Sequence, residues 1–112
     1  MLVKLGVSID KLERPIRRAL TLIDGVFKSE FGIEAVITST YEGDHQPGSL
    51  HYANLAVDFR IRNLTMAQRD DMKLAVKKAL RERYGDRQYD VLFSANDTCL
   101  HIEYEGRKEP NK

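Results

Sequence analysis

The spacing of apolar residues along the chain predicts two amphipathic helices. The first runs from Pro15 to Gly32, because its apolar side chains recur three or four positions apart, at Ile16, Leu20, Ile23 and Phe27, which is the period of one helix face. Pro15 suits the first turn, where its missing N–H leaves no bond unmade, and Gly32 suits the left-handed residue that ends a helix.

The second predicted helix begins at a capping box, in which the side chains of Thr65 and Gln68 each accept a hydrogen bond from the other's backbone N–H. It runs to about Tyr84 and is closed by Gly85-Asp86. The positions expected to face the core are Met72, Val76, Ala79 and Leu80.

Four short segments read as β-strands, because they are rich in β-branched and aromatic residues or alternate between apolar and polar positions. They are residues 33–40, 55–61, 89–95 and 98–104, the last two joined by a hairpin-like turn at Asn96-Asp97. Residues 41–50 hold two glycines, a proline, an aspartate and a histidine, so we expect a loop there. The sequence thus predicts an α+β domain, a small antiparallel sheet with two main helices packed on it.

Alternation along two of these strands assigns the faces of the sheet. The residues expected to build the core are Val57, Phe59 and Ile61 on one strand and Leu100, Ile102 and Tyr104 on the other. Those expected on the open face are Ala56, Asp58 and Arg60 together with Cys99, His101 and Glu103.

The composition limits the class of protein and the kinds of partner to be expected. The chain has 112 residues, of which 42% are hydrophobic and 31% charged, as in a folded single domain with a modest core. Its net charge of +1 leads us to expect neither nucleic acid nor an anionic membrane as a partner. No apolar run approaches the roughly 20 residues that span a bilayer, and the N-terminus lacks the features of a secretory signal. We expect a monomer made in the cytoplasm, with residues 1–14 as an arm laid on the domain and 106–112 as a flexible tail.

Two histidines and one aspartate are the candidate metal ligands. His51 precedes Asp58 by seven residues, and His101 lies far down the chain on the last predicted strand. A catalytic zinc takes three protein ligands and leaves its fourth position to water. The single cysteine, Cys99, cannot build a thiolate cage or an internal disulfide, so any metal site must use histidine and carboxylate.

These motifs carry a resemblance that runs from about Gly6 to Glu105. Its pieces are Thr38-Ser39, Glu42-Gly43, His45, Ser49-Leu50-His51-Tyr52, Ala56-Val57-Asp58 and His101-Ile102-Glu103-Tyr104. In this order they resemble the zinc D-alanyl-D-alanine carboxypeptidase and peptidoglycan endopeptidase family, which includes the vancomycin-resistance dipeptidases and several phage endolysins, and above all its small phage and prophage members. The resemblance implies that His51, Asp58 and His101 bind Zn²⁺ and that the substrate is a D-amino-acid-containing wall peptide.

Two positions depart from the family pattern. Members often have glycine where this chain has Asn54, and asparagine is the next-best residue for a left-handed turn. The better-known relatives place an acid three residues before the last histidine, where this chain has Thr98. Asp97 is therefore the first candidate for the general base. Glu103 is the second, or it is a partner that fixes the tautomer of a histidine.

Several neighbours of these motifs allow two interpretations. His45 is either an exposed loop residue or a residue at the rim that contacts substrate, and Ser49 could orient its neighbours through its hydroxyl. Arg60 is the alternative partner for Asp58, because a carboxylate in an apolar strand needs one. Cys99 is expected to fill space near the site, with competition for zinc as the alternative.

We therefore expect a zinc-dependent peptidase that hydrolyses peptide bonds of peptidoglycan through a metal-activated water, as a carboxypeptidase or an endopeptidase. It would act at the cell wall after release or as part of a virion. Two other classes stay open. One is a zinc-binding but catalytically weak wall-binding or virion component, and the other is a metal-free structural domain in which His51 and His101 are ordinary polar residues.

Overall fold

The computed structural model describes residues 1–40 and 54–106. Along the chain the elements are β1 (Leu2–Val3), α1 (Arg14–Phe31), β2 (Val36–Ser39), β3 (Ala56–Arg60), α2 (Met66–Tyr84), β4 (Tyr89–Ser94) and β5 (Cys99–Tyr104). Both predicted helices and all four predicted strands are confirmed; β2 covers half of its predicted range, and the other three strands are one or two residues shorter than predicted. The predicted loop over residues 41–50 and all but the first residue of the predicted tail lie outside the described residues.

The strands form one mixed sheet in the order β1-β2-β3-β5-β4. β1 runs parallel to β2, and the other three neighbouring pairs are antiparallel. The prediction of a purely antiparallel sheet is therefore wrong at one edge, where the N-terminal arm contributes a strand. The Leu2 N–H donates to the Ala35 carbonyl at 2.8 Å, and the Lys4 N–H donates to the Ile37 carbonyl at 2.9 Å.

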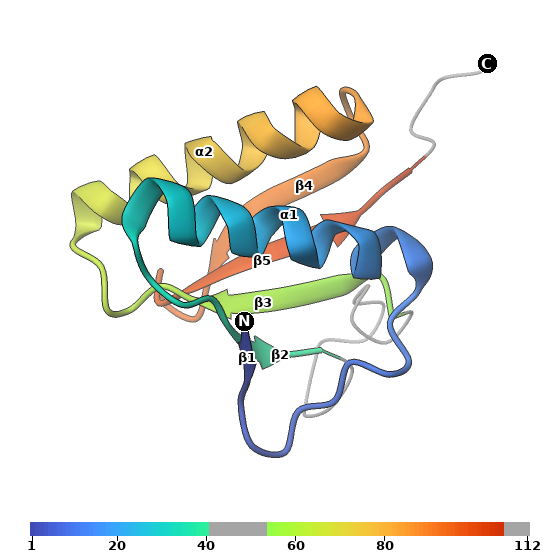
Figure 1. Cartoon of the computed structure of the whole chain (residues 1–112), viewed down its shortest axis with the longest axis horizontal. Helices are drawn as coiled ribbons and strands as arrows, with labels where there is room; N and C mark the ends of the chain where they lie inside the picture. The colour runs from blue at the N-terminus through green and yellow to red at the C-terminus, as the bar shows by residue number, and fades with distance from the viewer. Residues whose placement is uncertain (41–53, 107–112) are drawn as a thin grey trace.

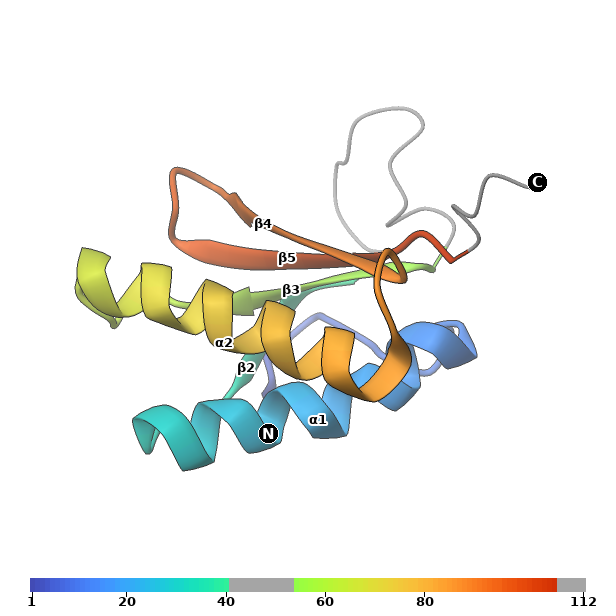
Figure 2. The ribbon, with the colours of Figure 1, turned by 90° about the horizontal axis from the view of Figure 1, so that it is seen from above.

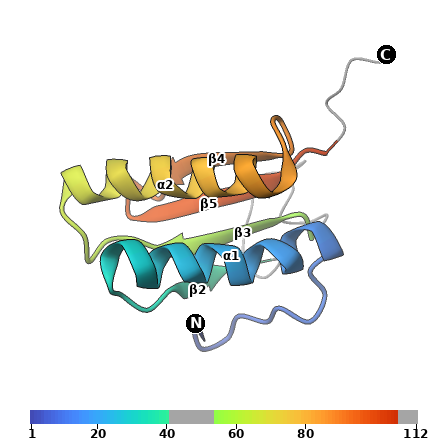
Figure 3. The same cartoon turned by 45° about the horizontal axis from the view of Figure 1, so that its top comes forward.

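Both helices cover the same face of the sheet (Figures 1 and 2). They lie side by side and run in opposite directions (Figure 3). Their apolar faces meet the sheet in one core, in which the rings of Phe27 on α1 and Phe59 on β3 lie 5.6 Å apart between centroids. The opposite face of β3 and β5 carries the candidate site.

The helix ends confirm the local signals. Pro15 lies in the first turn of α1, and Gly32 ends it at φ 66°, a left-handed conformation that glycine adopts without strain. At the start of α2 the Gln68 N–H donates to Thr65 Oγ1 at 3.1 Å, and the Thr65 N–H donates to Gln68 Oε1 at 2.9 Å. Gly85 closes α2. The two helices that cover the sheet are therefore bounded where the sequence predicts.

Alternation also assigns the faces of the sheet correctly. The residues that are buried on the helix side are Val57, Phe59, Ile61, Leu100 and Ile102, and Tyr104 packs against them while staying partly exposed. On α2, Met72, Val76 and Leu80 are buried, whereas Ala79 is only partly buried. Ala56 is buried too, although it belongs to the open-face set.

Candidate metal site on the open face of the sheet

The site is built on a direct pairing of two strands. Asp58 on β3 and His101 on β5 occupy opposed positions in the antiparallel ladder, and opposed side chains start only about 4.5–5.5 Å apart at Cβ. Asp58 Oδ1 and His101 Nδ1 lie 2.8 Å apart, and both side chains are 14% exposed. Two of the three predicted ligands are thus in contact, at a place that solvent reaches only in part.

A second carboxylate contacts the same imidazole. Glu103 lies two residues after His101, so the two side chains leave β5 on the same face, and Glu103 Oε1 is 2.8 Å from His101 Nε2. Burial by itself would lower the pKa of His101, but the hydrogen bonds and charges of Asp58 and Glu103 raise it above its ordinary value. The two carboxylates thus favour the protonated imidazole, in which both ring nitrogens are donors.

The donor atoms of this pair suit a zinc ion. Imidazole nitrogen and carboxylate oxygen bind Zn²⁺ at about 2.0–2.2 Å, and in a tetrahedral arrangement two such atoms stand about 3.3 Å apart. The Asp58–His101 separation of 2.8 Å would have to widen by a few tenths of an ångström. His51, the third predicted ligand, lies outside the described residues, as do the predicted substrate-binding residues His45 and Ser49.

The chain enters β3 through a turn of the expected kind. Asn54 has φ 61°, in the left-handed region that asparagine tolerates better than most residues. The carbonyl of Asn54 accepts a hydrogen bond from the Glu13 N–H at 2.9 Å. Asn54, which stands where family members often have glycine, thus adopts a conformation that glycine also adopts readily.

Asp97, the first candidate for the general base, lies in the turn between β4 and β5. Ala95, Asn96 and Asp97 have φ of 52°, 58° and 66°, and left-handed residues in a row are unusual outside glycine. The guanidinium of Arg69 on α2 donates to the Asp97 carbonyl at 3.0 Å. Asp97 is therefore held at the end of the hairpin, ahead of β5, while Glu103 on that strand contacts His101.

Two other residues of the open face are Arg60, which was the alternative partner for Asp58, and Cys99. Asp58 contacts His101, whereas within residues 1–40 and 54–106 the guanidinium of Arg60 makes no hydrogen bond or ion pair. Arg60 is thus not the partner of Asp58. Cys99 Sγ lies 3.6 Å from Thr38 Oγ1, and Cys99 is opposed to Arg60 in the ladder.

Two acidic residues near the site, Asp90 and Glu105, were not predicted from the sequence. Asp90 on β4 is directly opposed to Glu103, and carboxylate oxygens of Asp90, Glu103 and Glu105 all lie within 4.8 Å of one another. The signal was available in principle, because Asp90 and Glu103 occupy alternating polar positions on two strands of a predicted hairpin. Predicting that these residues meet requires the register of that hairpin, and a turn of this unusual conformation does not indicate the register.

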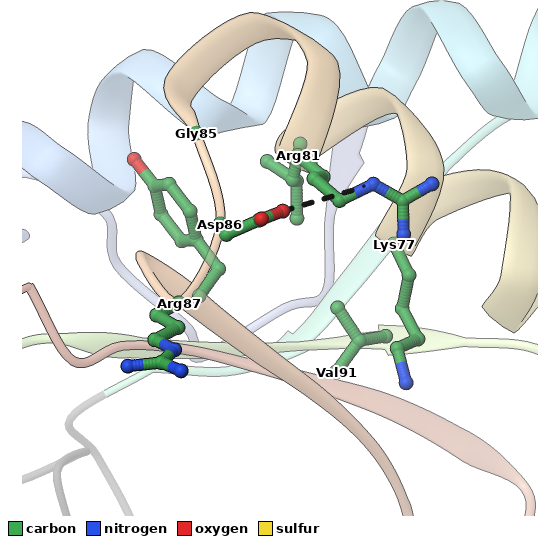
Figure 4. Close-up of a pocket in the computed structure, with 8 residues that line it drawn as sticks. Lys77, Arg81, Gly85, Asp86, Arg87 and Val91 are labelled. Atoms are coloured by element: carbon green, nitrogen blue, oxygen red, sulfur yellow. Dashed lines mark ion pairs between the residues drawn. The ribbon is translucent and has the colours of Figure 1, made fainter. Parts of the chain in front are cut away.

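A pocket of about 120 Å³ lies away from this site, between the end of α2 and the start of β4. Its lining includes Lys77, Arg81, Asp86 and Arg87, and Arg81 pairs with Asp86 at 3.9 Å. Figure 4 shows Lys77 and Arg87 on opposite sides of the pocket, so its cations do not converge on one point. The buried Val91 in its lining places it on the helix side of the sheet.

Comparison of the chain with protein-family models, curated proteins and solved structures found no match. Among the described residues, no helix has the length and apolar character needed to cross a membrane.

Proposed function

We propose that this chain is a zinc-dependent peptidase that hydrolyses D-amino-acid-containing peptide bonds of peptidoglycan. The observation that carries the proposal is the contact between Asp58 and His101 on the open face of the sheet. These two residues come from motifs 43 positions apart in the sequence, and the resemblance names both as ligands. A carboxylate and an imidazole that meet at a partly exposed surface are two of the three ligands of a catalytic zinc site.

In this proposal Asp58 and His101 hold the ion together with His51. A zinc ion bound there would polarise the scissile carbonyl and lower the pKa of a bound water to about 7. Glu103 accepts the Nε2–H of His101, which leaves Nδ1 directed at Asp58. Such a carboxylate fixes the tautomer and orientation of the histidine and makes it a stronger ligand.

The proton of the water needs a base that can later pass it to the leaving amine. Glu103 contacts the imidazole without being one of the proposed ligands, and it would serve as the base or only orient His101. Asp97 would have to reach the site from the end of the hairpin. The two roles are separable, because loss of the base lowers turnover with zinc retained, whereas loss of the orienting group weakens zinc binding.

One observation favours a second candidate function, a zinc-binding wall-binding or virion component with weak catalysis. Thr98 stands where the better-known relatives carry an acid, and its hydroxyl donates to the Ala95 carbonyl at 2.6 Å. The hydroxyl is thus engaged within the turn and cannot take a proton as a carboxylate would.

The experiment is digestion of purified peptidoglycan by the zinc-loaded protein, with the released peptides and amino acids identified by mass spectrometry. We expect cleavage by the parent and none by Asp58→Asn. Of Asp97→Asn and Glu103→Gln, the variant that lacks the base should retain zinc and lose about 10²- to 10⁴-fold in rate. A zinc-loaded parent that binds peptidoglycan but releases nothing would contradict the peptidase and support the second candidate.

A further inference from the structure

The open face of the sheet carries an arginine that has no partner among residues 1–40 and 54–106. Arg60 is the last residue of β3, and by alternation it shares a face with Asp58 while Phe59 and Ile61 point into the core. Its side chain is only partly exposed, yet within the described parts of the chain it makes no hydrogen bond or ion pair. The guanidinium of such a residue offers five N–H donors to a bound anion.

The neighbours of Arg60 leave that charge uncompensated. Across the ladder Arg60 is opposed to Cys99, and Cys99 is opposed in turn to Ser94. Both are neutral residues, so the row of the sheet at Arg60 contains no carboxylate. The carboxylates lie at the other end of the same face, where Asp90, Glu103 and Glu105 gather. Among the described strand residues of this face, Arg60 thus lies on one side of the Asp58–His101 pair, and Asp90 and Glu103 lie on the other.

Arg60 stands two residues from Asp58 on β3, so the two side chains leave the strand as neighbours on one face, where both could contact the same bound peptide. Two residues along a strand separate side chains on one face by about 6.6–6.8 Å. In a peptide cut at its last bond, the terminal carboxylate lies one residue beyond the scissile carbonyl, and successive Cα atoms are 3.8 Å apart.

We propose that Arg60 binds the free α-carboxylate of the substrate, so that the site takes peptides with a free C-terminus and removes their last residue. This inference rests on the proposed function and selects the carboxypeptidase form of it. Hydrolysis then adds the hydroxyl of water to the acyl carbon and its proton to the leaving amine, which gives a shortened peptide and one free amino acid. A guanidinium suits this task because it meets a carboxylate through two parallel hydrogen bonds.

The test compares two peptides that differ only at the C-terminus. One is an N-blocked tripeptide that ends in D-alanyl-D-alanine, and the other is the same tripeptide as its C-terminal carboxamide. Their dissociation constants are measured by calorimetry on the zinc-free protein, and their hydrolysis is measured on the zinc-loaded protein. The proteins are the parent, Arg60→Gln, Arg60→Lys and, as a matched control, Arg62→Gln, which removes the same charge from an exposed residue just after β3.

We expect the parent to bind the acid about 10- to 100-fold more tightly than the carboxamide, the range of a hydrogen-bonded charge. Arg60→Gln should lose this preference and raise KM for the acid, Arg60→Lys should keep part of it, and Arg62→Gln should match the parent. Equal binding of the two peptides by the parent, or an unchanged preference in Arg60→Gln, would overturn the inference.

Failure of the proposed function gives a different pattern. If the zinc-loaded parent cleaves neither peptide and also releases nothing from purified peptidoglycan, the peptidase proposal fails. Acid-selective binding that Arg60→Gln removes would still support Arg60 as the carboxylate site in that case, and the absence of such binding would overturn it as well.

Discussion

Asp58 and His101 face each other directly across β3 and β5, with 2.8 Å between Oδ1 and Nδ1. The contact depends on the register of the ladder, because a shift of one residue would turn either side chain into the core. The core faces of the same strands fix that register, since Val57 and Phe59 on β3 and Leu100 and Ile102 on β5 are buried. The packing of the domain thus holds the two candidate ligands together.

Replacing Glu103 with glutamine should weaken zinc binding and leave the fold intact. The carboxylate that accepts the Nε2–H of His101 would become an amide, which orients and polarises the ring less. Loss of such a partner typically lowers metal affinity about 10- to 100-fold. Competition with a chromophoric chelator measures the change, and Glu82→Gln on the exposed side of α2 is the control. An affinity equal to that of the parent would show that Glu103 does not orient His101 for the metal.

A substitution on the core face of β5 should lower the free energy of unfolding and leave zinc binding unchanged. Ile102 is fully buried, and Ile102→Val removes one methylene from the core, which costs about 0.5–1.5 kcal/mol of the free energy of unfolding. Urea unfolding of the zinc-free protein measures the loss. Zinc content should stay at the parent's value, because His101 and Glu103 leave the strand on the opposite face. A variant that loses its zinc while unfolding like the parent would contradict this separation of the faces.

Alkaline pH should destabilise the protein through Tyr89. Burial raises the pKa of the Tyr89 hydroxyl above its ordinary value of 10.0, and the hydrogen bond from Arg18 offsets part of this. Because the folded state holds the proton more tightly than the unfolded state, this stability is fully present below about pH 10 and is lost as pH rises through the folded pKa. Urea unfolding at several values between about pH 9 and 11 tests this.

The matched variant for that prediction is Tyr89→Phe, which keeps the ring and removes the titrating hydroxyl. The variant also loses the hydrogen bond from Tyr89 to the Pro15 carbonyl at 2.7 Å, so its stability at neutral pH is lower. Its free energy of unfolding should nevertheless fall less steeply between about pH 9 and 11. Identical slopes for parent and variant would show that Tyr89 has the same pKa in the folded and unfolded states.

Local signals predicted much of this fold. Pro15, Gly32 and the Thr65–Gln68 capping box bound the helices because their effects act within one turn. Alternation placed Asp58 and His101 on one face of the sheet because the side-chain period of a strand is two. What these signals share is that each depends on residues close together in the sequence.

The remainder depends on pairings between distant segments. The strand at Leu2–Val3 consists of two exposed residues, too few to show a pattern, and it is defined only by its bonds to the chain around β2. The position of Asp90 opposite Glu103 follows from the hairpin register. The contact between Asp58 and His101 likewise joins two strands that are distant in the sequence, and no local pattern of either strand reveals that His101 rather than Arg60 contacts Asp58.

The most direct test of the proposed zinc site is the zinc content per chain of freshly purified protein, measured by inductively coupled plasma mass spectrometry. The comparison set is the parent, His51→Ala, His101→Ala and, as a control for loss of a histidine, His45→Ala. We predict about one zinc in the parent and in His45→Ala, and almost none in the other two, because three protein ligands hold a catalytic zinc. A parent that takes up no zinc when zinc is offered, or variants of His51 and His101 that keep it, would contradict the metal site.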